Sequence, residues 1–275
     1  MNTIDLLRGM ILENVLLQFV CKYRAICKSD NEKSIFHLLN ESSLWFADAK
    51  YFNDPFDCQL NINFESNLYE MEFWIRSIRS FKLSYTDDDI KRKAIELTND
   101  NNKIRTIVDD LIKTNGVCCF SKEYDSILQW SHYADSHKGV CLVFDILKDP
   151  LFFNEIFPVD YRVDYQDFNF IKDFNSFVHK RLLPKYKDWE YEKEVRAFND
   201  QIGMKKFEKS ALAKIIFGCN ISPEEKKAII QTVLDLNYPN VEFIQAHKNH
   251  SEYKLDFFKI SNPITLIQHT NLSVI

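Results

Sequence analysis

The sequence predicts a single α+β domain over residues 1–275, with a helical insertion over residues 66–114. Three observations predict this fold class. Short apolar runs typical of strands occur in both halves of the chain, between segments whose apolar residues have helical spacing. Residues 66–114 are rich in charge and in helix formers, and "IRTIVDDLI" spaces its apolar residues as a helix does. No repeat or low-complexity linker divides the chain, so one core is expected.

Capping and turn residues justify the elements in the first part of the chain. The polar run "SDNE" is typical of a helix start, and Ile35, Leu38 and Leu39 then share one helix face. An Asn-Asp-Pro sequence is typical of a turn. The expected elements are a helix over 1–17, a strand over 17–24, a short helix over 29–42, a short strand within 43–57 that ends in the turn Asn53-Asp54-Pro55, and two or three helices over 66–114.

In the second part of the chain, apolar strands alternate with helices. Gly139 is expected to end one helix, Pro184 to end another, and Ser222 with Pro223 to begin a third. The expected strands cover 116–123, 140–146, 156–165, 190–198, 211–217, 241–249 and 253–260, and the expected helices cover 125–139, 166–187 and 222–236.

The composition argues against several classes of site. The chain has only 5 Gly and contains neither GxGxxG nor GxxxxGK[ST], so a glycine-rich phosphate-binding loop is not expected. A net charge of −5 argues against a protein that coats nucleic acid, because such a protein needs a basic surface. By contrast, 23 Phe and 12 Tyr predict an aromatic core and aromatic side chains that line a pocket.

Cysteine usage and the N-terminal segment indicate a cytoplasmic protein. Seven cysteines, an odd number without CxxC spacing, fit a reducing compartment and contain no metal-finger pattern. The apolar N-terminal segment is interrupted by Asp5, Arg8 and Glu13, which argues against both a signal peptide and a membrane span. We therefore expect no membrane partner and no metal.

The stretch "DWEYEKEVRAF", residues 188–198, concentrates three glutamates. In a strand, alternation would place Glu190, Glu192 and Glu194 on one face, followed on that face by Arg196 and Phe198. Beside a pocket, this face would offer a pair of carboxylates with a positive neighbour. Alternatively, the glutamates form ion pairs with nearby lysine and arginine side chains on a solvated sheet edge.

Four segments stand in the order and spacing of a known family. They are "LWFADAKYFNDPFD", "CCFSKEYDSILQWSHYADSHKGVCLVFD", "KYKDWEYEKEVRAF" and "KIIFGCN". In these segments the chain resembles a bacterial family catalogued as domain of unknown function 2971, from Tyr23 to the last strand. The family name implies no activity. Its members are mentioned among candidate phage-defence proteins, which implies an antitoxin or another defence component as a partner.

A second resemblance offers a chemistry. ADP-ribosyltransferases of the Arg–Ser–Glu kind have an Arg or His that ends the first strand, a Ser or aromatic residue at the start of a middle strand, and a Glu, often Glu-x-Glu, on a later strand. This order is matched by Arg24, by Phe120-Ser121 and by Glu192-x-Glu194. The segment after Arg24 also looks like that of DarT-like enzymes. The resemblance implies a mixed, split β-sheet core of ADP-ribosyltransferase-like type.

The same resemblance implies NAD as substrate and assigns roles. Cleavage of the nicotinamide–ribose bond develops positive charge on ribose, which Glu194 would stabilise, while Glu192 would orient or deprotonate the acceptor. Arg24 would bind phosphate or a ribose hydroxyl, Ser121 would position Glu194, and an aromatic side chain would stack on nicotinamide. The full set of expected NAD contacts is Tyr23, Arg24, Asn53, Asp54, Phe120, Ser121, Trp130 and Tyr133, with Phe52 as a further stacking candidate.

Each assignment has a structural alternative. Arg24 is equally compatible with an ion pair, and Ser121 with a hydroxyl bonded to the backbone at a strand end. In the turn, Asn53 is expected to bond backbone amides and Asp54 to line the site. Trp130 and Tyr133 share a helix face that a core would also use. The sequence favours neither His132 and His137 as metal ligands nor a Cys119–His132 nucleophilic pair.

The leading functional hypothesis is a NAD-consuming mono-ADP-ribosyltransferase-like effector, a toxin in antiphage defence that modifies a nucleic acid or a protein. A close variant is a NAD glycohydrolase, with water as acceptor. The alternatives from other classes are a non-catalytic ligand- or protein-binding sensor of the same fold, and a metal-dependent nuclease that uses Asp54, Asp57 and the glutamates. The acceptor, the trigger and the oligomeric state do not follow from the sequence.

Overall fold

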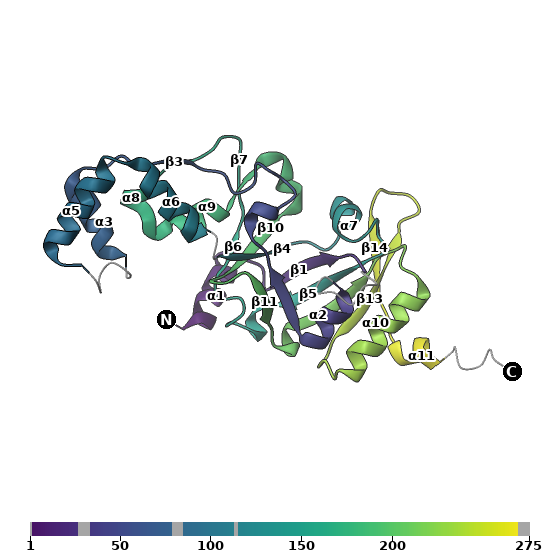
Figure 1. Cartoon of the computed structure of the whole chain (residues 1–275). Coiled ribbons are helices and arrows are strands. Elements are labelled where there is room, and N and C mark those ends of the chain that lie inside the picture. Colours follow the sequence, from purple (N-terminus) through teal and green to yellow (C-terminus); the bar gives the residue numbers. More distant parts are fainter. Residues whose placement is uncertain (1, 27–33, 79–84, 113–114, 269–275) are drawn as a thin grey trace.

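The computed structural model describes residues 2–26, 34–78, 85–112 and 115–268. Its centre is one eight-stranded mixed sheet in the order β14-β13-β12-β5-β1-β4-β10-β6 (Figure 1). All neighbouring strands are antiparallel except β12 and β13. In that order the strands are Leu255–Lys259, Glu242–Lys248, Leu212–Phe217, Val140–Asp145, Phe19–Arg24, Gly116–Ser121, Glu194–Asn199 and Ile156–Pro158. The α+β class expected from the sequence is confirmed.

Helices cover both faces of this sheet. On one face, a core that includes Leu7, Leu38 and Ile229 joins α1 (Thr3–Leu12), α2 (Ile35–Glu41) and α10 (Pro223–Asp235) to the strands. On the other face, α7 (Ile127–Tyr133) places Trp130 against Tyr23 of β1, with ring centroids 5.2 Å apart. Apolar burial on two faces explains why the central strands are continuous apolar runs in the sequence.

The sheet opens between β1 and β4. These two strands pair only at Cys21 and Ser121, whereas β1 pairs with β5 along its whole length. Beyond that point the Lys22 ammonium donates to the carbonyl oxygen of Cys119 at 2.8 Å, in the space where a strand ladder would continue. Ala47, after β2 (Ser43–Phe46), bridges Val117 at the far end of β4. The two halves of the sheet therefore separate at the C-terminal end of β1.

Within the predicted insertion, the described residues form α3 (Leu68–Ser77), α5 (Asp87–Thr98) and α6 (Asn101–Ile112), which project from the sheet in Figure 1. Asn67 and Thr86 cap α3 and α5, each with a complete capping box. The helices have a core of their own, centred on Trp74 and separate from the core of the sheet. This core also contains Phe168, Phe170, Ile171 and Phe177, which come from a later segment of the chain.

That later segment corrects the helix expected over 166–187. It contains the short strand β8 (Asp167–Asn169), which pairs with β3 (Asn61–Asn63), and then two short helices. Asn169 interrupts the helical pattern because its side chain accepts from the amides of Ile171 and Lys172, and so begins a new helix. The remaining elements are α8 (Phe170–Asp173), η3 (Phe174–Ser176), α9 (Phe177–Leu182) and β9 (Pro184–Tyr186).

Other boundaries also differ from the expectation. The first helix ends at Leu12, and the strand expected over 156–165 divides into β6 and β7 (Asp160–Arg162), of which β7 pairs with β9. Residues 29–33 of the second expected helix lie outside the described residues. The strand β11 (Gly203–Lys206), which pairs with β2, was not predicted. Further short elements are η1 (Ala49–Tyr51), η2 (Ile146–Lys148), η4 (Lys187–Glu192), η5 (Lys209–Ala211) and α11 (Pro263–Gln268).

The helix expected over 125–139 ends at Tyr133 instead of at Gly139. Asp135, Ser136 and His137 follow in the left-handed region, with φ values of 45°, 54° and 68°. Gly139 has a different role from the expected helix stop, because a Cβ atom there would lie 2.1 Å from the carbonyl oxygen of Arg24. Only glycine allows this close approach, which sets the backbone position of Arg24.

Candidate active site

A cavity of about 910 Å³ lies where β1 and β4 separate. Its walls come from the C-terminal ends of β1 and β4, the end of α7, the turn that contains Asn53, and the segment from β9 to the start of β10. Cavities of this size are typical of sites for small molecules and cofactors. Of the expected site residues it is lined by Tyr23, Arg24, Asn53, Phe120, Ser121, Tyr133, Glu192 and Glu194, together with Phe52.

The glutamates do not lie on one strand, as the sequence pattern predicted. Residues Lys187–Glu192 form the 3₁₀-helix η4, Lys193 is left-handed with φ 44°, and β10 begins at Glu194. Glu190 is exposed, whereas Glu192 and Glu194 are buried at 4% and 5% exposure. The turn at Lys193, rather than strand alternation, brings the two buried carboxylates to the same cavity.

Lys185 of β9 joins the two carboxylates. Its Nζ atom lies 2.5 Å from Glu192 Oε2, 2.7 Å from Glu194 Oε2 and 3.8 Å from Asp57 Oδ2. Burial lowers the pKa of Lys185, but Glu194 and Glu192 raise it above the usual range, so the ammonium stays charged. The ammonium also lies 5.2 Å from the centroid of the Trp189 ring.

Arg196, which is fully buried, binds Glu194 and Asp57 but not Glu192. Its Nε donates to Glu194 Oε1 at 2.8 Å, and its Nη2 donates to both oxygens of Asp57 at 2.9 and 2.8 Å. Its Nη1 donates to the carbonyl oxygen of Leu182 at 2.6 Å. The guanidinium is therefore satisfied on every side, as a buried charge must be.

The described residues of this network carry an excess of negative charge. Asp57, Glu192 and Glu194 supply three carboxylates against the two cations Lys185 and Arg196. Burial raises the pKa of Glu194, but Arg196 and Lys185 lower it to about 2, so Glu194 is ionised at neutral pH. The cavity thus borders a buried anionic group, at which a positive charge would be stabilised.

Ser121 and Tyr133 position Glu192 in different ways. The Ser121 hydroxyl donates to the main-chain carbonyl oxygen of Glu192 at 2.7 Å, and the Gln129 amide donates to the same oxygen at 3.1 Å. The Tyr133 hydroxyl donates to the carboxylate itself, at 2.6 Å from Oε1. Burial and this hydrogen bond raise the pKa of Tyr133. Ser121 stands at the end of β4, opposite Glu194, as the strand expected over 116–123 implies, whereas the corresponding element of the Arg–Ser–Glu resemblance stands at the start of its strand.

Arg24 reaches the cavity from a different row of side chains. Cys21, Ser121 and Glu194 lie in register across β1, β4 and β10, and Arg24 follows Cys21 by three residues. By strand alternation, the Arg24 side chain therefore leaves β1 on the face opposite to that of Cys21, Ser121 and Glu194. Residues from both faces border the cavity because the strands separate here. Trp130, by contrast, is fully buried and donates to the carbonyl oxygen of Tyr124 at 2.7 Å, so it is a core residue and not a stacking surface.

The turn at Asn53 and Asp54 reverses the expected roles. Asp54 does not line the cavity, and its Oδ1 accepts from the amide of Phe56 at 2.9 Å. Asn53 lines the cavity close to the Tyr133 hydroxyl. Asp54 caps the turn because the backbone amide of Phe56, two residues later, lies within reach of its carboxylate.

We therefore expect Asp54→Ala to lower the free energy of unfolding by about 1 kcal/mol, because it removes the turn hydrogen bond. Asn53→Ala is expected to change stability by less and to weaken ligand binding in the cavity. Thermal unfolding of both variants, with ligand titrations, measures the two effects. A larger loss of stability in Asn53→Ala than in Asp54→Ala would contradict this assignment.

Lys185 and Gln129 are site residues that were not predicted from the sequence, and Asp57 was named only for the nuclease alternative. Lys185 stands in "KYKDWEYEKEVRAF" and Asp57 closes "LWFADAKYFNDPFD", so both lie in the segments that carry the family resemblance. That position was the one available signal, since neither spacing nor periodicity links Lys185 or Asp57 to the glutamates. Both oxygens of Asp57 accept from Arg196, which leaves Asp57 poorly suited to the nuclease alternative.

Two further properties concern possible partners. Among the residues that the structure describes, no group of three or more His, Cys, Asp or Glu side chains is placed to hold a metal ion. In the same residues, no helix combines the length and apolar character needed to cross a membrane.

Comparison with known proteins finds a similarity to a family over part of the chain. No curated protein and no solved structure matches the chain. Residues 129–197 match the model of a family described as "Protein of unknown function (DUF2971)". The matched segment starts at Gln129 in α7 and ends at Ala197 in β10, so it contains Tyr133, Lys185, Glu192 and Glu194. Over this segment, which supplies most of the buried ionic network, the chain is similar to the DUF2971 family.

Proposed function

We propose that the chain is a NAD-consuming, ADP-ribosyltransferase-like enzyme, which cleaves the nicotinamide–ribose bond and transfers ADP-ribose to a nucleic acid or a protein. The observation that carries this proposal is the buried network with three carboxylates and two cations, open to a cavity of about 910 Å³. The nicotinamide ring of NAD is a cation, and the transition state moves that positive charge onto the ribose. An anionic group of low pKa stabilises both species.

In the proposed reaction the bond between ribose C1′ and the nicotinamide nitrogen breaks, and its electron pair leaves with neutral nicotinamide. The nucleophile of the acceptor then forms a bond to C1′ and releases a proton. Glu194 stabilises the positive charge on ribose. Glu192, whose Oε1 accepts from Tyr133 at 2.6 Å, acts on the acceptor together with that hydroxyl. Arg24, on β1, binds phosphate or a ribose hydroxyl at the cavity wall.

The arrangement of the strands supports the same proposal. Arg24, Ser121 and Glu194 of the Arg–Ser–Glu resemblance lie on β1, β4 and β10, which are neighbours in the sheet. The sheet separates beside them, between β1 and β4, as a split β-sheet core would. A toxin role in antiphage defence, held in check by an antitoxin or another defence component, is the cellular part of this proposal.

A second function, ligand binding without turnover, is favoured by one observation. Glu192 and Glu194 each accept hydrogen bonds at both carboxylate oxygens, from Tyr133, Lys185 and Arg196. The negative charge of a carboxylate held in this way is partly compensated by its partners, as in an ion pair that only stabilises the fold. In a sensor of this kind, the cavity would bind a nucleotide and leave it intact.

The test is incubation of the purified protein with NAD, with nicotinamide release followed by chromatography and NAD binding followed by calorimetry. Under the proposed function, nicotinamide accumulates, and added nucleic acid or protein acquires ADP-ribose. Release without any modified acceptor would identify a NAD glycohydrolase. Binding without release would support the sensor, and the absence of both binding and release would overturn the proposal.

A further inference from the structure

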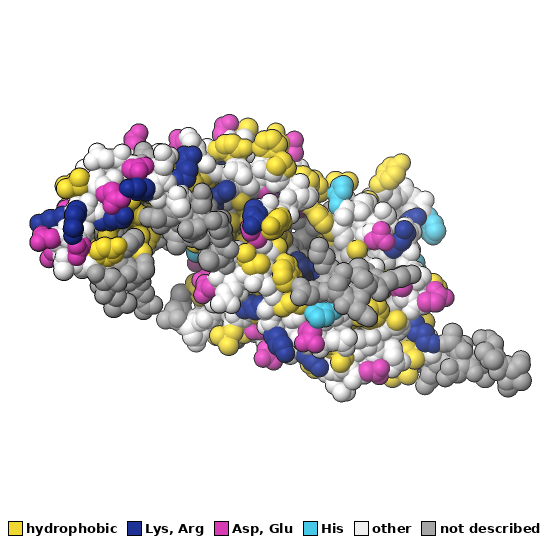
Figure 2. All heavy atoms as spheres, in the orientation of Figure 1, with side chains coloured by type: hydrophobic (Ala, Val, Ile, Leu, Met, Phe, Trp, Pro, Cys, Tyr) yellow, Lys and Arg dark blue, Asp and Glu magenta, His cyan; other side chains and the backbone are white. Residues whose placement is uncertain are grey.

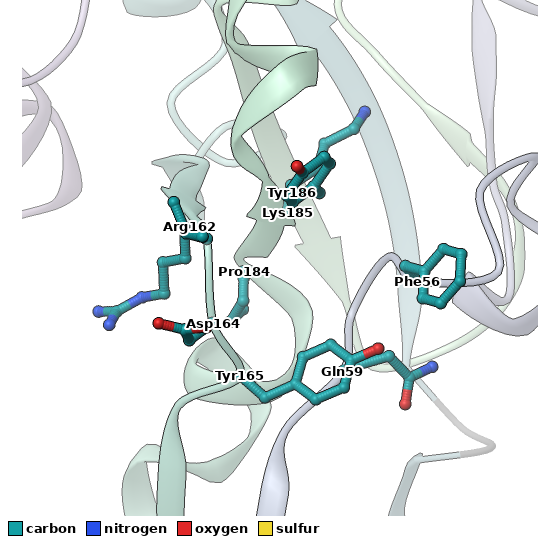
Figure 3. Close-up of a pocket in the computed structure, with 9 residues that line it drawn as sticks. Phe56, Gln59, Arg162, Asp164, Tyr165, Pro184, Lys185 and Tyr186 are labelled. Carbon is teal, nitrogen blue, oxygen red and sulfur yellow. The ribbon is translucent and has the colours of Figure 1, made fainter.

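A second cavity, of about 380 Å³, lies beside β9 and shares only Lys185 with the lining of the candidate active site. Pro184, Lys185 and Tyr186 of β9 form one wall, the loop Val163–Tyr165 forms another, and Phe56 and Gln59 close it. Figure 3 shows these side chains set around Pro184, with the ammonium of Lys185 pointing away from them. This cavity is therefore separate from the ionic network, although it shares the backbone of β9.

The cavity is bordered by exposed aromatic rings. Phe56, Tyr165 and Tyr186 are 63%, 55% and 44% exposed, and Val163 beside them is 68% exposed. Hydrophobic side chains also gather on the surface at the loop that follows β7 (Figure 2). A flat apolar ligand would shield these rings from solvent. The planar ring of any nucleic-acid base can stack on an aromatic side chain in this way.

The polar groups of the cavity define the rest of the ligand. The Gln59 amide nitrogen donates to the carbonyl oxygens of Pro55 and Asp57, both at 3.4 Å, so its amide oxygen is the group that it offers, as an acceptor, to the edge of a heterocycle. Asp164 brings a carboxylate, which accepts from hydroxyls such as those of ribose and repels a phosphate. Arg162 does not offset this repulsion, because its Nε and Nη2 lie 2.7 and 2.6 Å from Asp160 Oδ2.

We propose that this second cavity binds an uncharged nucleoside, with the base stacked on the aromatic side chains, its edge at Gln59 and its ribose hydroxyls at Asp164. The volume of about 380 Å³ is within the range of sites for small molecules. The proposal does not depend on the proposed function, since binding here requires no reaction of NAD.

Calorimetric titration of the full chain with adenosine and with cytidine tests the proposal. Both nucleosides are expected to bind, because stacking tolerates different bases. Adenosine 5′-monophosphate is expected to bind more weakly than adenosine, and methyl riboside, which has no base, not to bind. Tyr165→Ala is expected to weaken nucleoside binding about tenfold or more, while Tyr165→Phe keeps the ring and the affinity.

Two controls separate this site from the larger cavity. Saturation with NAD and the variant Glu194→Gln are both expected to leave adenosine binding unchanged, because NAD would occupy the larger cavity and Glu194 lines that cavity and not the second one. The proposal is overturned if adenosine does not bind, if its monophosphate binds as tightly, if Tyr165→Ala keeps the affinity, or if NAD displaces adenosine. None of these outcomes bears on whether nicotinamide is released.

Discussion

Glu194→Gln is expected to lower nicotinamide release by about 10²-fold or more, the loss typical when a charge-stabilising group is removed from an active site. Glutamine has nearly the same shape but carries no charge. In the variant the network has two carboxylates, Asp57 and Glu192, against the two cations Lys185 and Arg196. The excess negative charge that would stabilise the developing cation on ribose is then absent, whereas a neutral network remains compatible with the fold.

Two other glutamates of the same stretch serve as matched variants. Glu190→Gln changes an exposed side chain outside the cavity and is expected to keep full activity. Glu192→Gln is expected to reduce transfer to the acceptor more than NAD cleavage, because Glu192 holds the Tyr133 hydroxyl and not the ribose in the proposed reaction. Nicotinamide release, acceptor labelling and thermal unfolding are measured for all three variants. Wild-type release by a folded Glu194→Gln protein would contradict the proposed function.

The sequence predicted which elements form the fold better than where they end. The central strands were found because burial on two faces leaves nearly continuous apolar runs, as in Val140–Asp145. The helix expected over 166–187 failed because its apolar residues serve a second core, beside Trp74, and because Asn169 interrupts it by capping a new helix. Tertiary packing of the insertion decides this segment, and that packing is not visible in local periodicity.

Prediction of the candidate site from the sequence was limited in a similar way. Alternation along "EYEKEVRAF" placed Glu192 and Glu194 beside one pocket. Both do line one cavity, but the left-handed Lys193 and the 3₁₀-helix, and not alternation, bring them together. Lys185 was missed because its role depends on β9, a three-residue strand that pairs with β7 only in the folded chain. Short elements of this kind have no sequence pattern long enough to be recognised.

Arg196→Met is expected to lower the free energy of unfolding by about 3–5 kcal/mol, the cost of leaving buried charges without their partner. Arg196 is fully buried and serves Asp57, Glu194 and the carbonyl oxygen of Leu182 at once. Without it, three carboxylates would face the single cation Lys185, and methionine fills the space without replacing any hydrogen bond.

A matched control is Arg92→Met, which removes an arginine whose side chain is 77% exposed and which pairs with Asp89 on the surface of α5. Solvent screens such a pair, so this variant is expected to lose less than about 1 kcal/mol.

The double variant Arg196→Met with Asp57→Leu should recover part of the loss, because it removes one unpaired buried carboxylate together with its partner. Urea unfolding of the three variants measures these differences. A loss in Arg196→Met no larger than that in Arg92→Met would show that the network does not hold the turn, β9 and β10 together, and the anionic character assigned to the cavity would then lack its structural basis.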